Sequence, residues 1–121
     1  IHNKVNDYRS FQGLSTLVMQ PLAFEEARRI SDKLANGIYQ SDDPQIQSAV
    51  ENFASLLGGT NHGSIIMTSN IENADSIVNT MLDFPSIVEI IERDYTQSGV
   101  GVSESTDGIF HICHLFVNIP N

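Results

Sequence analysis

Residues 95–117 read YTQSGVGVSESTDGIFHICHLFV, and this stretch decides the fold class. Val100 and Val102 alternate with small residues in the first half, which is the period-two pattern of β-strands, and the second half is mostly apolar. Thr106, Asp107 and Gly108 lie between the halves, and an Asp-Gly pair supplies the positive φ angles that tight hairpin turns require. The stretch therefore predicts a β-hairpin with strands at 98–104 and 109–117.

Upstream of the hairpin, apolar residues follow a helical period. The spacing predicts helices at 1–12, 21–36, 45–57, 70–83 and 86–93. Residues 64–68 form a short apolar run that predicts a buried strand, whereas residues 14–18 are expected to be an extended connector. Helices followed by a strand, two more helices and a hairpin indicate an α+β domain, in which helices cover a small antiparallel sheet.

Length and charge narrow the class of protein. The chain has 121 residues, the size of one domain, so residues 1–121 are interpreted as a single unit. The sequence has six Lys and Arg residues and 15 Asp and Glu residues, which gives a net charge of −9. Phosphate backbones repel such a chain, so no nucleic-acid partner is expected. The acidic surface is either a solvated face or one that attracts divalent cations or a basic partner.

Cysteine content and hydropathy bear on where the protein works. Cys113 is the only cysteine, so no internal disulfide can form, which fits a cytosolic protein or a bacterial exported one. No run of 18 apolar residues is present, so no membrane-spanning helix is expected. The sequence begins at Ile1, inside an amphipathic segment, so any signal peptide or lipid anchor would lie upstream.

Four short segments carry a family resemblance. They are VNDYRSFQGLSTL at 5–17, ARRISDKLA at 27–35, ADSIVNTML at 74–82 and YTQSGVGV at 95–102, the last followed by Asp107-Gly108 and the final strand. In this order and spacing the sequence resembles the CAP superfamily of cysteine-rich secretory, antigen 5 and pathogenesis-related proteins, also called the SCP-like domain. It is most similar to the disulfide-free bacterial branch. The resemblance implies a three-layer α-β-α sandwich and an exported protein at the cell surface or outside the cell.

The resemblance also places a cleft whose metal-binding tetrad is degenerate here. Members with the full pattern hold two histidines and two acids around a central cleft. Matched to this sequence, the histidine positions fall on Ile30 and near Ser86, the glutamate near Ile65, and the remaining acid loosely on Asp83. Isoleucine offers no metal ligand, so neither a metal nor a cofactor is expected, and the cleft is either filled as core or an apolar pocket.

Three further residues are candidates for a rebuilt site. Glu51 begins the sequence Glu-Asn-Phe-Ala, which is similar to a family motif but lies too early in the chain and within a predicted helix, where we expect it to face solvent. His62 is expected in the flexible loop 58–63. His114 lies on the last predicted strand, where alternation places it with Phe110, Ile112 and Phe116 on one face.

Two other side chains capable of chemistry have structural interpretations. Alternation places His111 and Cys113 together on the second face of the last strand, but the ligands that would complete a metal site are not nearby in sequence. Cys113 has apolar neighbours, so its thiol is expected to be buried and inert. His2 is expected to be exposed in the first helical turn.

Two hypotheses about function follow. The first is a non-catalytic domain, secreted or on the cell surface, that binds a ligand such as a lipid or another small apolar molecule, or binds a host or envelope protein. The second is a hydrolase with a site rebuilt around His62, Glu51 or His114. The two differ in geometry, since a catalytic site requires these side chains to converge on one pocket, whereas a binding domain leaves them scattered.

Overall fold

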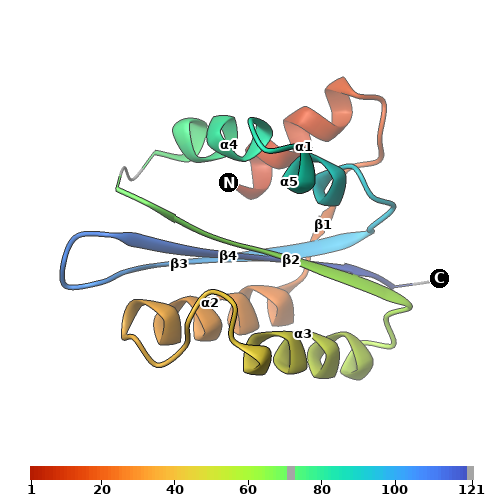
Figure 1. The fold of residues 1–121 in the computed structure, drawn as a ribbon. Coiled ribbons are helices and arrows are strands. Elements are labelled where there is room, and N and C mark those ends of the chain that lie inside the picture. The colour runs from red at the N-terminus through yellow and green to blue at the C-terminus, as the bar shows by residue number, and fades with distance from the viewer. Residues whose placement is uncertain (71–72, 120–121) are drawn as a thin grey trace.

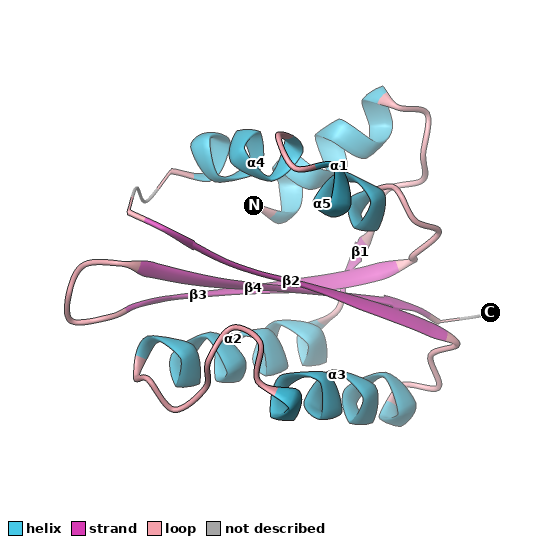
Figure 2. Cartoon of the chain, viewed as in Figure 1, coloured by secondary structure: helices cyan, strands magenta, loops and turns pink. Residues whose placement is uncertain are grey.

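The computed structural model describes residues 1–70 and 73–119. In these ranges the chain forms nine elements, labelled in Figure 1 and coloured by type in Figure 2: α1 (His2–Phe11), β1 (Val18–Met19), α2 (Pro21–Ala35), α3 (Pro44–Leu56), β2 (Asn61–Ser69), α4 (Ala74–Leu82), α5 (Pro85–Ile91), β3 (Gln97–Glu104) and β4 (Phe110–Asn118). The predicted hairpin is confirmed. Gly108 has a φ of 83°, and the Ser105 amide donates to the Ile109 carbonyl across the turn.

The sheet has four strands in the order β1-β3-β4-β2. β4 lies between β3 and β2 and is antiparallel to both. The sequence predicted a purely antiparallel sheet and missed β1, which pairs in parallel with β3 at Gln97 and Ser98. The observed sheet is therefore mixed. Two residues are too few to show alternation, so only the distant pairing partner reveals β1 as a strand.

Helices cover both faces of the sheet, which confirms the α+β three-layer sandwich. α1, α4 and α5 lie on one face, and α2 and α3 lie on the other (Figure 1). Each face has its own apolar core. The core on the α1 face includes Val5, Met81 and Phe116, and the core on the α2 face includes Ala27, Val50 and Leu115.

Local capping chemistry explains where two helices begin. Asp43 accepts a hydrogen bond from the Gln45 amide at the start of α3. Asn73 accepts from the Ser76 amide at the start of α4, so that helix begins at residue 74 and not at residue 70 as the spacing suggested. Ile71, which falls within the helix predicted at 70–83, lies outside the described residues.

Two residues of the first helix fix the chain to its connector. Asn6 donates from Nδ2 to the Leu17 carbonyl over 2.9 Å and accepts from the Leu17 amide over 2.7 Å. The buried Arg9 guanidinium donates to the carbonyls of Ser15, Ile91 and Arg93. The Asn and Arg of the first family-like segment therefore have a structural role, because they join α1 to the loops before β1 and after α5.

Candidate functional site

The four positions matched to the family tetrad do not form one site. Ile30 on α2 is fully buried in the core on the α2 face, and Ile65 on β2 is 3% exposed in the core on the opposite face. Asp83 and Ser86 are both exposed where α4 ends and α5 begins. Both isoleucines are packed as core residues, and the sheet separates them.

These residues do not fit a metal ion. Zn²⁺ and similar ions need several N, O or S ligands at bonding distance, and the two buried positions offer only hydrocarbon. Across residues 1–70 and 73–119, no group of three or more His, Cys, Asp or Glu side chains is arranged to hold a metal.

The candidates for a rebuilt catalytic site are also apart. His62 lies in β2 opposite Val117, so its expected placement in a loop was wrong. His114 is fully buried on β4 and stacks on Phe116, with 4.2 Å between the ring centroids. Ile65 on β2 pairs with His114, so the side chains of these two residues lie on the same face of the sheet. His62 is three residues before Ile65 on β2, an odd number, so its imidazole lies on the opposite face from that of His114.

Glu51 is the third of these candidates. It is exposed on α3 and accepts a hydrogen bond from Gln47 on the same helix over 3.3 Å. Neither imidazole is among its hydrogen-bond or ion-pair partners in the described part of the chain. The three side chains therefore do not converge on one pocket.

The remaining thiol and histidine candidates are held within the fold. Burial raises the pKa of the Cys113 thiol to about 12, which leaves almost no nucleophilic thiolate at neutral pH. His2 was expected to be exposed but is 8% exposed, and its Nδ1 lies 3.0 Å from Ser98 Oγ. Helical spacing alone could not reveal this contact, because Ser98 belongs to a strand far along the chain.

A groove lies between α2 and α3 in the described structure. Its volume is about 710 Å³, and the start of α2 lies beside the end of α3, since Leu22 and Leu56 line the same groove. The two helices run side by side on one face of the sheet (Figure 1). Its apolar lining includes Leu22, Tyr39, Ala49, Phe53, Leu56 and Leu57. A pocket of this size with a mainly apolar lining is typical of small-molecule sites.

The charged groups of the groove lie on α2. Arg29 pairs with Glu26 one helical turn earlier, and this hydrogen bond, with a smaller contribution from Tyr39, raises the pKa of Arg29. Glu25 also lines the groove and has no ion-pair partner among the described residues. The charge of Arg29 is thus balanced by Glu26, and the carboxylate of Glu25 is left in excess. Such a groove disfavours an anionic ligand.

Sequence reasoning missed this groove, although one signal pointed to it. Leu56 is 87% exposed and Leu22 is 50% exposed, so both large apolar side chains remain accessible to solvent. In the sequence, Leu56 falls beside the core stripe of its helix and not within it. An apolar residue off the stripe marks a second apolar surface, but the partner helix that completes the groove is fixed only by the tertiary fold.

The described helices include none long and apolar enough to cross a membrane.

Comparison with solved structures identifies proteins of the same fold. An outer surface protein from Borrelia burgdorferi superposes with a TM-score of 0.82 at 16% identity, over 98% of this chain and 90% of that one. An extracellular protein containing an SCP domain from Bacillus anthracis gives a TM-score of 0.77 at 17% identity, over 94% of this chain and 37% of that one.

A cysteine-rich secretory protein from Staphylococcus aureus is similar as well. It gives a TM-score of 0.77 at 9% identity, over 97% of this chain and 36% of that one. The present chain thus spans little more than a third of the Bacillus and Staphylococcus proteins. No curated protein sequence matches it. The sequence model of the CAP cysteine-rich secretory protein family matches residues 2–117, and the chain therefore belongs to the CAP family.

Proposed function

We propose that this CAP domain is exported and acts as a non-catalytic binding domain, with the groove between α2 and α3 as its ligand site. The observation that carries the proposal is the groove itself, about 710 Å³ in volume, with Leu22 and Leu56 exposed along it. Large apolar side chains kept in contact with water at a concave surface are typical of a binding site.

The absence of catalysis rests on the placement of the candidate side chains. His62 and His114 lie on opposite faces of the sheet, and Glu51 projects from the surface of α3. A hydrolase needs a nucleophile, a base and an orienting group within hydrogen-bond reach of one another. The Cys113 thiol has a pKa of about 12 and so is a poor nucleophile.

The groove favours an uncharged or cationic apolar molecule. Phe53, Ala49 and Leu57 supply hydrocarbon surface, while the Glu26–Arg29 pair and Glu25 supply a polar rim with excess negative charge. An alkyl or aryl ligand gains from burial there, but a free carboxylate on the ligand would meet Glu25. The export part of the proposal is supported by the descriptions of three similar structures as outer surface, extracellular or secretory proteins.

Binding of the neutral dye N-phenyl-1-naphthylamine tests the groove. The dye is expected to bind the domain and to gain fluorescence, and Leu56→Glu should weaken that binding about tenfold or more, because it removes apolar surface and adds a charge. Phe84→Glu is the matched control, since Phe84 is 51% exposed but does not line the groove. Equal loss of binding in both variants would contradict the assignment.

An esterase assay separates the rival hydrolase from the binding domain. With the domain present, p-nitrophenyl butyrate is expected to hydrolyse no faster than in buffer alone at pH 7. Turnover that disappears in His62→Ala would overturn the non-catalytic proposal and favour a site rebuilt around that residue. Dye binding in the groove would remain a separate result, so the two halves of the proposal fail independently.

A further inference from the structure

The outer edge of the sheet is open along most of β3. β1 covers only its first two residues, so 100–104 form the edge. The Gln20 amide donates to the Ser98 carbonyl, which therefore points outward, whereas the Ser105 amide donates inward to the Ile109 carbonyl. By the alternation of a strand, Val100 and Val102 present their N–H and C=O groups on the same side as Ser98. No described strand pairs with them on that side.

A hollow runs beside this open edge. It has a volume of about 740 Å³ and lies between β3 and α2, where Phe24, Arg28, Val100 and Val102 line it. A smaller hollow of about 350 Å³ continues it towards Glu104. Five edge residues span about 16 Å, enough to pair with a short extended segment.

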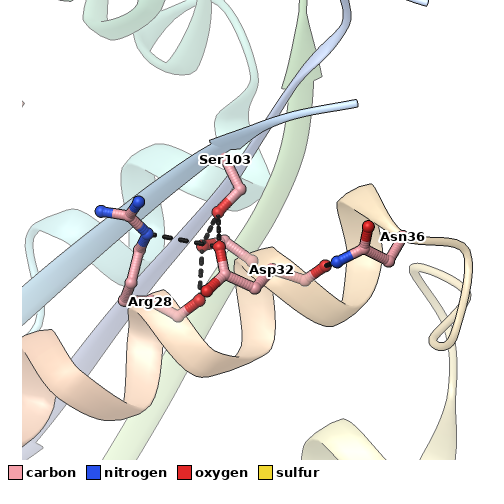
Figure 3. A network of polar contacts seen from close by, with 5 residues as sticks. Arg28, Asp32, Asn36 and Ser103 are labelled. Carbon is pink, nitrogen blue, oxygen red and sulfur yellow. Dashed lines mark hydrogen bonds and ion pairs between the residues drawn. The ribbon is translucent and has the colours of Figure 1, made fainter. Parts of the chain in front are cut away.

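Hydrogen bonds within the protein hold the polar side chains that line the hollow. Figure 3 shows Arg28 and Ser103 directed towards Asp32, between α2 and β3. Ser103 donates to Asp32 Oδ1, Arg28 Nε lies 3.3 Å from the same oxygen, and Ser31 Oγ lies 2.9 Å from Ser103 Oγ. The Ser103 hydroxyl, with a smaller contribution from Arg28, lowers the pKa of the Asp32 carboxyl and keeps it charged. Both bonds end on Oδ1, and no hydrogen bond is described to Oδ2.

The charge beside the edge identifies the kind of partner. Glu25 and Glu104 line the two hollows and form no ion pair among the described residues, and Asp32 keeps one free carboxylate oxygen. Two cations also line the hollow, but each is already paired within α2: Arg28 with Asp32, and Arg29 with Glu26. A second copy of the chain would bring the same carboxylates and a further charge of −9, so it is disfavoured.

We propose that the β3 edge at 100–104 binds an extended, basic segment of a protein partner by strand addition. The partner's backbone pairs with Val100 and Val102, and its Lys or Arg side chains reach Asp32, Glu25 and Glu104. Backbone pairing supplies affinity, while the carboxylates select a basic segment over an acidic one. This site lies on the β3 side of α2 and borders the groove between α2 and α3, because Glu25 lines both hollows.

A synthetic peptide tests strand addition directly. The probe is a nine-residue peptide of alternating lysine and valine, N-methylated at every second amide, so that one backbone edge can pair and the peptide cannot stack on itself. It is expected to bind, with affinity falling as salt rises. On binding, amide hydrogen exchange should slow at Val100 and Val102. Methylation of every amide should abolish binding, and so should glutamate in place of lysine.

Two protein variants locate the pairing. Val102→Pro removes the outward N–H, and proline is tolerated on an edge strand, so binding should weaken about tenfold while the circular dichroism spectrum is kept. Val102→Thr keeps the amide and should bind as the wild type does. Should Val102→Pro unfold the domain, the fully methylated peptide still decides the question with the wild-type protein.

Several results would overturn the proposal. These are binding that survives full methylation of the peptide, protection that appears away from Val100 and Val102, or no binding of the one-edge peptide at low salt. Concentration-dependent dimerisation of the domain that Val102→Pro abolishes would instead assign the edge to a second copy. Displacement of the dye from the α2–α3 groove by the peptide that is unchanged in Val102→Pro would show that the peptide uses that groove, and would contradict binding at the β3 edge.

Discussion

Replacing Gly101 with valine is expected to destabilise the domain by about 3 kcal/mol or more. A Cβ at this position would lie 2.5 Å from the carbonyl carbon and oxygen of Ala27, closer than any real Cβ contact allows. The obstacle is the backbone of α2, which cannot move aside as a side chain can. Gly99 repeats the arrangement one helical turn earlier, with a built Cβ 2.7 Å from that of Ala23. The two glycines therefore let α2 pack directly on β3.

Chemical denaturation followed by circular dichroism measures this loss. Gly108→Asn is the control, because Gly108 sits in the hairpin turn with open space around it and asparagine tolerates positive φ, so its cost should stay within about 1 kcal/mol. Equal stability of Gly101→Val and the wild type would contradict the close packing of α2 on β3. Since Ala27 obstructs through its backbone, Ala27→Gly should not rescue the valine variant.

Acidification is expected to destabilise the domain well before its carboxylates titrate. His114 is fully buried, and neither ring nitrogen has a described hydrogen-bond partner. Burial lowers the pKa of His114 from 6.5 to about 3, with a further contribution from His2. Between pH 6.5 and about pH 3, the unfolded chain binds a proton at His114 that the folded protein does not bind. Stability is therefore fully present above pH 6.5 and falls by about 1.4 kcal/mol per pH unit below it.

Unfolding free energies measured between pH 7 and pH 4.5 check this slope. From pH 6.5 to 4.5 the loss should reach about 2–3 kcal/mol. In His114→Leu most of the slope should vanish, and stability at pH 7 should be kept or raised because two unpaired nitrogens leave the core. Burial also lowers the pKa of His2, so a smaller slope of the same sign remains. An unchanged slope in His114→Leu would contradict the assignment.

The fold could be read from the sequence wherever a local pattern carried it. The hairpin around Asp107-Gly108 and the apolar stripe at 74–82 follow from periodicity and turn chemistry, and both are present. β1 could not be read, because a two-residue strand exists only through its pairing with Gln97 and Ser98. The burial of His2 was missed for the same reason, since it depends on contact with Ser98.

The candidate site was less accessible to sequence reasoning. Alternation placed His114 on the same face of β4 as Ile112 and Phe116, and His114 stacks on Phe116 in the structure. Matching the tetrad by motif, however, placed Ile30 and Ile65 in one cleft, whereas the sheet separates them. Motif spacing counts residues along the chain and does not record which face of a strand a residue takes. The groove between α2 and α3 depends on how two helices pack, which no local pattern encodes.

The α2–α3 groove is the ligand site that we propose for this domain. Nitrogen-15 NMR spectra recorded during titration with N-phenyl-1-naphthylamine test it most directly. We expect amide shifts to change around Leu22, Ala49, Phe53 and Leu56, which line the groove, with no change near Asp83 or Ser86. Shifts confined to the neighbourhood of His62 or of Asp83 and Ser86, with the groove silent, would contradict it.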